Sequence, residues 1–314
     1  MKAVQINAYG GGEVLKINDN APKPSITKGQ VLVEVYAASI NPIDWKIRQG
    51  YLAQMAPLIF PATLGGDFSG VVVEVGGDVN GFKKGDEVYG SASLLGGGSG
   101  SFAEFAAASV KTIAHKPKGI SHLAAASLPL AGVSAWQGLV DHLGLAKDQK
   151  ILIHGGAGGI GTVAIQLAKH LGGYVATTVS AQDIDYVKNL GTDEVIDYKS
   201  QTFENFLRDY DAVFDTVGGE TYLKSFKVLK KGGVIVSMVE SENRELAQQY
   251  GVEAISQGTQ VNSERLMKLA ELVDQNVIKA QVDKVFPLEK AKEAFKHLEE
   301  GHVRGKVVLE IKKS

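Results

Sequence analysis

The sequence predicts an α/β protein in which a β-rich domain precedes a doubly wound parallel-sheet domain. Three observations lead to this prediction. Short β-type runs separated by Gly and Pro fill the first third of the chain. From about residue 121, continuous apolar runs alternate with segments of helical periodicity. A glycine-rich turn lies between the first apolar run of strand length and the helix that follows it.

In the β-rich part, turn residues separate five strand-forming runs: 2–6, 31–37, 69–75, 87–91 and 102–106. Their spacing predicts a small domain with a barrel-like sheet. The segment 94–101, LLGGGSGS, contains four glycines, so we expect a surface loop that forms a hairpin tip or borders a cleft. The apolar tract 124–139 is interrupted by Pro129 and Gly132, which favours a buried helix pair over a membrane span.

The second part repeats a rhythm of strand and helix. We expect strands at 150–154, 174–180, 194–198, 212–216 and 233–239. We expect helices between them at 160–171, 183–190, 203–208 and 222–229. Apolar strands alternating with amphipathic helices predict a parallel sheet with right-handed crossovers.

The C-terminal part contains two further helices, at 264–274 and 287–300, and a final strand at 306–311. We expect that strand to return to the first domain, which makes this domain discontinuous. The predicted domains are therefore 1–123 with 266–314, and 124–265.

Composition excludes several functional classes. The chain has 314 residues, no cysteine and a formal charge of −2. These values argue against disulfide frameworks, cysteine nucleophiles, cysteine-ligated zinc and nucleic-acid binding. The seven histidines show no HExxH spacing, so we expect no metal site. With no signal-peptide pattern and no long apolar run, we predict a cytoplasmic protein without a membrane segment.

The turn after strand 150–154 reads GGAGGIG and contains G-x-G-x-x-G at Gly156, Gly158 and Gly161. Its position between a strand and a helix is the context that dinucleotide binding requires. We expect Gly156 to permit the tight turn, Gly158 to let the backbone approach a diphosphate, and Gly161 to let helix and strand pack closely. Free N–H groups at the helix start would then bind the diphosphate. A purely structural turn is the alternative.

The end of the second strand indicates which dinucleotide is bound. An acidic residue at that position would bind the adenosine ribose and repel a 2′-phosphate. Here the strand ends in Val179 and Ser180, and a hydroxyl can donate to a phosphate, which favours NADPH. No Arg or Lys follows closely, whereas Asp183 and Asp185 do, so NADH stays an alternative.

Several further segments carry a family resemblance. The GGIG at 158–161 is followed by Gln166 and Lys169, and NPID at 41–44, GGDFSGV at 65–71, PLAGVSAW at 129–136 and RGKVVL at 304–309 complete the pattern. Together they resemble the zinc-independent quinone oxidoreductase branch of the medium-chain dehydrogenase/reductase superfamily. One departure is Gly156, where the branch usually has Ala or Ser.

The resemblance implies a GroES-like substrate domain joined to a Rossmann domain, with NADPH in the cleft between them. It implies a quinone or conjugated carbonyl as the hydride acceptor, and a homodimer formed through the last Rossmann strand, about 234–239. Asn41, Ser134 and Lys306 would lie near the nicotinamide or the substrate, and Ser180 and Tyr198 near the 2′-phosphate. The expected cofactor contacts are Gly156, Ala157, Gly158, Gly159, Ile160, Gly161, Ser180, Tyr198, Ser134, Val217 and Lys306.

Hydride transfer creates negative charge on the carbonyl oxygen of the acceptor, and a neutral donor there lowers the barrier by about 3–4 kcal/mol. Asn41 is our candidate for that donor, with a turn-stabilising role before Pro42 as the alternative. Tyr51 is a candidate proton donor, or else an aromatic wall of the pocket. We expect Asp44 to have an orienting role or to cap a helix. We expect Asp67 to pair with a cation such as Lys46 or to stabilise its turn.

The sequence predicts an NADPH-dependent quinone or enone reductase. Two alternatives stay open. One is a dinucleotide-binding protein with little turnover, acting as a redox sensor or structural partner. The other is a zinc-free ketone or aldehyde reductase, in which hydride reaches the carbonyl carbon.

Overall fold

A computed structural model describes residues 1–313 and divides them into two compact units. Unit 1 contains residues 1–130, 261–275 and 280–313, and unit 2 contains residues 131–260 and 276–279. The expected boundaries at 123/124 and 265/266 lie a few residues away from these, and residues 276–279, which were expected in the first domain, belong to unit 2. Helix α2 (His122–Ala126) packs on the strands of unit 1, and Ser263 Oγ donates to the Val110 carbonyl oxygen of the same unit (2.6 Å), so both flanking segments belong to unit 1.

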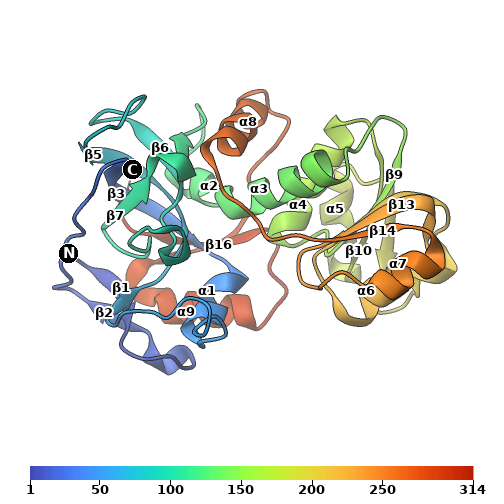
Figure 1. Ribbon diagram of the computed structural model, residues 1–314, viewed down its shortest axis with the longest axis horizontal. Coiled ribbons are helices and arrows are strands. Elements are labelled where there is room, and N and C mark those ends of the chain that lie inside the picture. The colour runs from blue at the N-terminus through green and yellow to red at the C-terminus, as the bar shows by residue number, and fades with distance from the viewer. Residues whose placement is uncertain (314) are drawn as a thin grey trace. The chain divides into compact units, whose positions relative to one another are not determined.

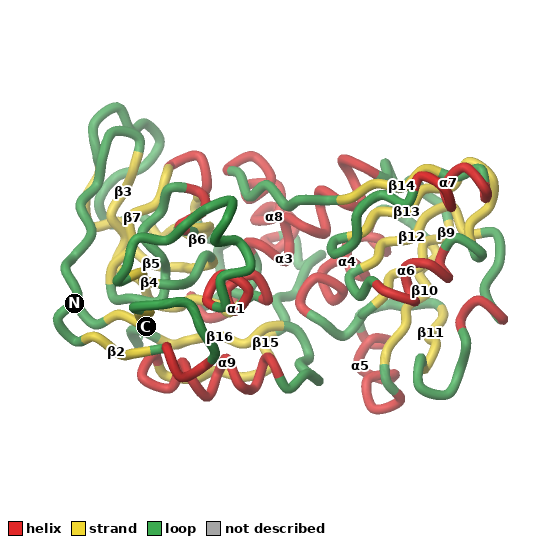
Figure 2. The backbone as a smooth tube through the Cα atoms, turned by 60° about the horizontal axis from the view of Figure 1, so that its bottom comes forward, coloured by secondary structure: helices red, strands yellow, loops and turns green. Residues whose placement is uncertain are grey.

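Unit 2 is built on a six-stranded parallel sheet in the order β11-β10-β9-β12-β13-β14. Figure 2 shows these strands in yellow. Their bounds are β9 Lys150–His154, β10 Tyr174–Val179, β11 Glu194–Asp197, β12 Tyr210–Asp215, β13 Leu229–Ser237 and β14 Glu253–Ser256. The strand order reverses between β9 and β12, and ligands of such sheets bind at this switch point, outside the carboxyl ends of the strands.

Helices cover both faces of this sheet. Helices α4 (Gly159–His170) and α5 (Ile184–Asn189) lie on one side, and α6 (Gly219–Ser225) and α7 (Arg244–Tyr250) on the other (Figure 1). Helix α3 (Pro129–Trp136) and the π-helical turn Gln137–His142 that continues it precede β9. The doubly wound α/β architecture predicted from the sequence is confirmed.

Two of the helices expected in unit 2 have different bounds or a different type in the structure. Residues 203–208 form only a single 3-10 turn, Phe203–Asn205, because Asp209 adopts a positive φ of 60° and β12 begins at the next residue. The helix expected at 222–229 instead begins at Gly219 and ends at Ser225, and Leu229 already belongs to β13.

The last strand of the sheet was also wrongly predicted. Segment 234–239 was expected to be the free edge, but β13 pairs with β12 on one side and with β14 on the other. Both of its edges are therefore engaged within the chain, and it cannot pair with a second copy. The edge strand on this side is β14, four residues that the sequence pattern did not reveal.

Unit 1 contains two sheets. Strands β2 (Lys16–Asn18), β1 (Ala3–Ile6) and β4 (Ala62–Thr63) form the smaller one. The larger sheet has the order β15-β16-β3-β5-β6-β8, with β7 also paired to β3. Its strands are β3 Gln30–Ile40, β5 Asp67–Val75, β6 Glu87–Ser91, β7 Phe105–Ser109, β8 Ile113–His115, β15 Val282–Pro287 and β16 Lys306–Glu310. As expected, the last strand returns to this domain, where β16 pairs antiparallel with β3.

Besides α2, three further helices belong to unit 1. Helix α1 (Pro42–Arg48), which the sequence pattern did not reveal, directly follows β3 and begins with Pro42, as suits a first helical residue. Helix α8 (Ser263–Asp274) is attached to β6 by the Tyr89 hydroxyl, which donates to the Leu266 carbonyl oxygen at 2.6 Å. Helix α9 (Ala291–Glu299) packs near α1.

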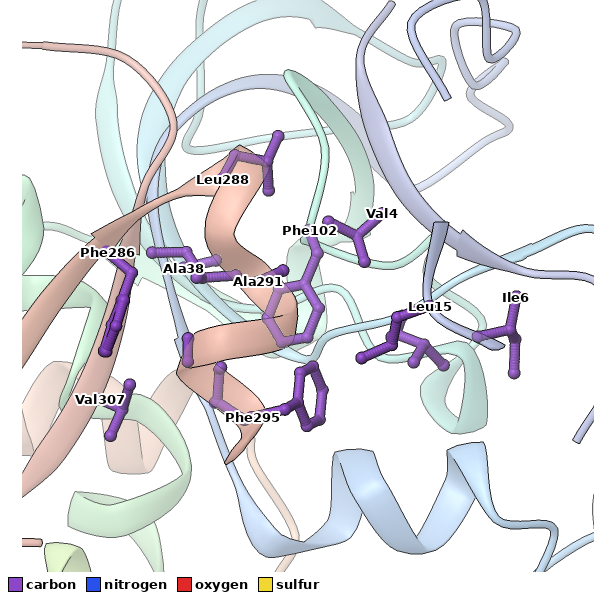
Figure 3. Close-up of a cluster of buried hydrophobic side chains, with 14 of the residues drawn as sticks. Val4, Ile6, Leu15, Ala38, Phe102, Phe286, Leu288, Ala291, Phe295 and Val307 are labelled. Carbon is purple, nitrogen blue, oxygen red and sulfur yellow. The ribbon is translucent and has the colours of Figure 1, made fainter. Parts of the chain in front are cut away.

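One core cluster of unit 1 joins both ends of the chain (Figure 3). Val4 and Ile6 from the N-terminal part pack with Phe286 and Phe295 from the C-terminal part. The ring of Phe102 meets that of Phe295 edge to face, with centroids 5.9 Å apart. Burial of these side chains stabilises the discontinuous unit, since neither end can bury its apolar surface alone.

Among residues 1–313, no helix is both long and apolar enough to cross a bilayer.

Candidate cofactor and substrate sites

The glycine turn joins β9 to α4 at the carboxyl edge of the sheet in unit 2. Gly155 carries the positive φ, 73°, that the tight turn requires. The tight turn was expected at Gly156, but the residue with the positive φ is Gly155, one position earlier. Gly158 is the N-cap of α4, and the first intrahelical bond runs from the Thr162 N–H to its carbonyl oxygen.

The three motif glycines have different reasons to lack a side chain. A Cβ at Gly156 would lie 2.1 Å from Thr177 Oγ1, and one at Gly161 would lie 2.2 Å from the Gly155 carbonyl oxygen. Both positions therefore serve close packing. A Cβ at Gly158 would meet nothing closer than 3.4 Å, so that side of the turn is open. Packing does not explain the glycine at position 158, whereas a ligand lying against the turn does.

Apolar side chains are exposed at the same edge of the sheet. Tyr198 follows β11, Val217 follows β12 and Val239 follows β13, and these residues are 54%, 53% and 49% exposed. Two of them, Tyr198 and Val217, belong to the expected cofactor contacts, and Val239 was not anticipated. Asp215 fixes the loop that carries Val217, because its Oδ1 accepts from the N–H groups of Val217 and Gly218, both at 3.0 Å.

The tip of β10 differs from the expectation that it has no acid. Ser180 Oγ donates to Asp183 Oδ2 at 2.6 Å, and both side chains are buried. The 3-10 turn Ala181–Asp183 causes this, since it returns the Asp183 N–H to the Ser180 carbonyl oxygen at 2.9 Å. The Asp183 carboxylate, three residues after Ser180, thus reaches the tip of β10.

Ser134, another expected cofactor contact, is fully buried in α3. Its Oγ lies 2.7 Å from Thr259 Oγ1, and its carbonyl oxygen accepts from Gln257 Nε2 at 3.0 Å. In this structure Ser134 therefore joins α3 to the segment that follows β14. These partners could not be read from the sequence, because they are more than a hundred residues away.

His154, at the end of β9, has both ring nitrogens in hydrogen-bond contact, with Thr178 Oγ1 (3.0 Å) and Ser225 Oγ (2.9 Å). Burial lowers the pKa of this histidine to about 4, although the nearby Asp215 opposes the shift. The imidazole is consequently neutral near pH 7 and stabilises the packing of β9.

In unit 1, Asn41 lies at the junction of β3 and α1 and is the N-cap of α1. Its Nδ2 donates to Asp67 Oδ2 at 2.9 Å, and its Oδ1 accepts from Lys306 Nζ. The Asn41 backbone N–H donates to Asp44 Oδ2 at 2.7 Å, which confirms that Asp44 caps the helix. All four side chains are buried. They form what we call the Asn41 network: Asn41, Asp44, Asp67 and Lys306.

The charges of the Asn41 network shift one another's protonation. Burial raises the pKa of Asp44 to about 7, and the charge of Asp67 adds to this effect, while the Asn41 N–H and Lys306 oppose it. Burial also raises the pKa of Asp67, with Lys306 again opposing. Burial lowers the pKa of Lys306, and both carboxylates counteract this. The network therefore holds two buried carboxyl groups beside one buried amine.

Two residues of this region have partners that the sequence did not indicate. Lys306, an expected cofactor contact, donates through its Nζ to the Ile40 carbonyl oxygen (2.8 Å) and to Asn41. Asp67 was expected to pair with a cation such as Lys46, but its cation is Lys306. The Lys46 ammonium instead lies 5.7 Å from the centre of the Trp45 ring. Lys306 comes from β16, and only its pairing with β3 brings it to this position.

Tyr51 lies in the turn after α1 and is 66% exposed. Its ring meets that of Trp45 edge to face, with centroids 5.9 Å apart. The exposed phenol is accessible to a small molecule, whereas the Asn41 amide is nearly enclosed. Within residues 1–313, no three or more His, Asp or Glu side chains are grouped so that they could hold a metal ion.

Comparisons with known proteins agree with these features. The family model described as "Alcohol dehydrogenase GroES-like domain" matches residues 27–118, and the one described as "Zinc-binding dehydrogenase" matches residues 190–309. The chain is 40% identical to a tomato (Solanum lycopersicum) protein named 2-methylene-furan-3-one reductase, over 98% of this chain and 79% of the relative. It has the same identity and coverage with an Arabidopsis thaliana protein named NADPH-dependent alkenal/one oxidoreductase, chloroplastic.

Solved structures of quinone oxidoreductases resemble the fold of this chain. The quinone oxidoreductase from Coxiella burnetii superposes with a TM-score of 0.92 at 39% identity, covering 99% of both chains. The Escherichia coli quinone oxidoreductase complexed with NADPH superposes with a TM-score of 0.88 at 28% identity, covering 99% of this chain and all of the other. The glycine turn, the two domain types and these relatives show that this chain belongs to the quinone oxidoreductase branch of the medium-chain dehydrogenase/reductase superfamily.

Proposed function

We propose that the chain is a zinc-independent, NADPH-dependent oxidoreductase that reduces quinones or α,β-unsaturated carbonyls. The observation that carries the proposal is the open glycine turn at the start of α4, at the switch point of the sheet, in a chain whose relatives are named as reductases of such compounds.

The residues of unit 2 fit a dinucleotide. The side of the turn at Gly158 has room for a diphosphate, and the N–H groups of Gly159, Ile160 and Gly161 precede the first intrahelical bond. Tyr198 and Val217 offer exposed apolar surface to the rest of the cofactor. The bound nicotinamide would supply the hydride.

The residues of unit 1 would act on the acceptor. Lys306 binds the amide oxygen of Asn41, which polarises the amide and makes its NH2 group a stronger donor. One amide hydrogen goes to Asp67, and we propose that the other stabilises the negative charge that develops on the carbonyl oxygen. The exposed Tyr51, or water, would then protonate the enolate.

Zinc does not fit these residues. The chain has no cysteine, and Asn41 offers an amide that already contacts Asp67 and Lys306. The Lys306 ammonium supplies positive charge next to Asp67, so a divalent cation there would face strong repulsion. The term zinc in the description of one matching family model therefore does not transfer to the residues of this chain.

We also propose a homodimer that forms through β14, the outer strand of the sheet in unit 2, rather than through β13. Pairing of two β14 strands would extend the sheet across a two-fold axis. Sedimentation of wild type and of a variant with Pro in place of Ile255 tests this proposal, because proline removes an N–H from the edge strand. A cytoplasmic location stays a prediction from the sequence.

A steady-state assay of NADPH oxidation tests the proposed function, with an ortho-naphthoquinone and a small enal as acceptors. Turnover of both acceptors, with a saturated carbonyl as the enal product, would support the proposal. An alcohol product would identify a ketone or aldehyde reductase. Saturable NADPH binding without turnover would identify the redox-sensing or structural alternative.

A further inference from the structure

The contact between Ser180 and Asp183 bears on the choice between NADPH and NADH. In Rossmann folds, the adenosine ribose of the cofactor lies at the tip of the second strand, which here is β10. At this tip Ser180 Oγ donates its hydrogen to Asp183 Oδ2 at 2.6 Å. A hydroxyl has one hydrogen to donate, so towards a ligand Ser180 presents only lone pairs.

A ribose hydroxyl and a 2′-phosphate require different partners at this position. The 2′-hydroxyl of NADH is a donor, and the lone pairs of Ser180 can accept from it. The 2′-phosphate of NADPH is an acceptor with about two negative charges and needs N–H or O–H donors and cations. Ser180 cannot be that donor while Asp183 holds its hydrogen, and the carboxylate repels the phosphate.

Neighbouring charges add to this repulsion. Asp197, the last residue of the adjacent strand β11, accepts from Ser200 Oγ (2.6 Å) and from the Lys199 N–H (3.1 Å). These hydrogen bonds lower the pKa of Asp197, so it carries a negative charge near pH 7. The Lys199 ammonium acts on Asp197. The carboxylates of Asp183 and Asp197 thus both lie near this end of β10 and β11.

We propose that Asp183 determines cofactor specificity in this chain: by engaging the Ser180 hydroxyl and placing a carboxylate at the tip of β10, it reduces the preference for NADPH over NADH, so that the enzyme also uses NADH. The inference rests on the proposed function only in that unit 2 binds a dinucleotide at the glycine turn. Ser180, which the sequence suggested as the phosphate donor, is kept from that role by Asp183.

The test is Asp183→Asn, with Kd values for NADPH and NADH measured by calorimetry. The substitution removes the charge and keeps a side-chain oxygen that accepts from Ser180. We expect the ratio of Kd for NADH to Kd for NADPH to rise at least ten-fold, mainly through tighter NADPH binding. The increase in this ratio of Kd values should be smaller at high salt, because salt screens the repulsion between the carboxylate and the 2′-phosphate.

The matched control is Asp185→Asn, which makes the same charge change at an exposed position two residues away on α5. It should change the ratio less than two-fold. A ratio that stays within two-fold in Asp183→Asn, or that rises equally in both variants, would overturn the role of Asp183 and leave the proposed function intact. Wild-type protein that is well folded and binds neither dinucleotide would overturn both.

Discussion

Asn41 shows how one side chain is set by residues from distant parts of the chain. Its amide nitrogen is held by Asp67 on β5 and its amide oxygen by Lys306 on β16, so both the position and the orientation of the amide are fixed. The NPID motif at 41–44, which follows a β-type run, singled out Asn41 and Asp44. The sequence could not show that Lys306 points inward, since that depends on the pairing of β16 with β3.

Asn41→Ala should lower kcat at least ten-fold if the amide stabilises the developing charge. Lys306→Met should also lower kcat, because the amide loses the cation that orients and polarises it, while the KM for NADPH stays nearly unchanged. Steady-state kinetics of both variants, with Tm as a control for folding, checks this. A large rise in the KM for NADPH in Lys306→Met would instead make Lys306 a cofactor contact.

Asp44 should make stability depend on pH. Its folded-state pKa of about 7 lies above the ordinary value of 3.8, so between these pH values the folded state holds a proton that the unfolded state has released. Stability from this group is therefore lost as the pH rises, by up to about 1.4 kcal/mol per pH unit. His154 has a lowered pKa and acts in the opposite direction.

The comparison that isolates Asp44 is therefore wild type against Asp44→Asn. Urea unfolding from pH 4 to pH 8 should show that the variant gains stability relative to wild type as the pH rises. Asp185→Asn is the exposed control and should track the wild type. A constant difference across this pH range would mean that Asp44 ionises normally in the folded protein.

Gly158 and Gly161 should respond differently to alanine. Gly158→Ala should fold with a nearly unchanged Tm, because the new Cβ meets only ordinary contacts. Gly161→Ala should be strongly destabilised, since its Cβ would lie 2.2 Å from a carbonyl oxygen. Gly158→Asp should fold but lose NADPH binding, as it adds a charge where the diphosphate belongs. Retained affinity in Gly158→Asp would contradict the placement of the diphosphate.

At the scale of the elements, the α1–α9 contact holds the helix that Asn41 caps. Arg48 is fully buried at the end of α1 and donates to both carboxylate oxygens of Glu299 on α9, at 2.9 and 3.3 Å. Glu299→Gln would leave this buried cation without its counter-charge and should destabilise the protein by about 3 kcal/mol. Glu300→Gln, an exposed neighbour, is the control. Equal unfolding midpoints for the two variants would show that the pair contributes nothing.

The elements that sequence patterns predicted best are strongly apolar, such as β9 with its buried KILIH run and the twelve-residue helix α4. The short ones were missed or misplaced for physical reasons. The segment around the 3-10 turn Phe203–Asn205 has a helical composition. The positive φ of Asp209 lies in the left-handed region, so the chain turns away before a helix can form. β14 has only four residues, too few for a periodic signal, and it receives its hydrogen bonds from β13.

At the scale of the whole molecule, the chain begins and ends in the same unit, and the core that contains Phe102 and Phe295 needs both ends. We expected this discontinuous organisation from a final strand that returns to the first domain, and β16 does pair with β3. Sequence patterns also predicted the glycine turn between β9 and α4. The contacts on which the proposed roles of Asn41 and Ser180 depend arise from tertiary pairing and from a local 3-10 turn, which residue types alone do not determine.

The central claim is that a dinucleotide bound at the glycine turn delivers a hydride to a conjugated acceptor. Its most direct test uses NADPH carrying deuterium at nicotinamide C4, in each of the two stereospecifically labelled forms, with an enone as acceptor. Mass spectrometry and NMR of the product should find deuterium at the β-carbon of the saturated carbonyl compound, from one labelled form only. A product without label from either form, or with label at the carbonyl carbon, would contradict the claim.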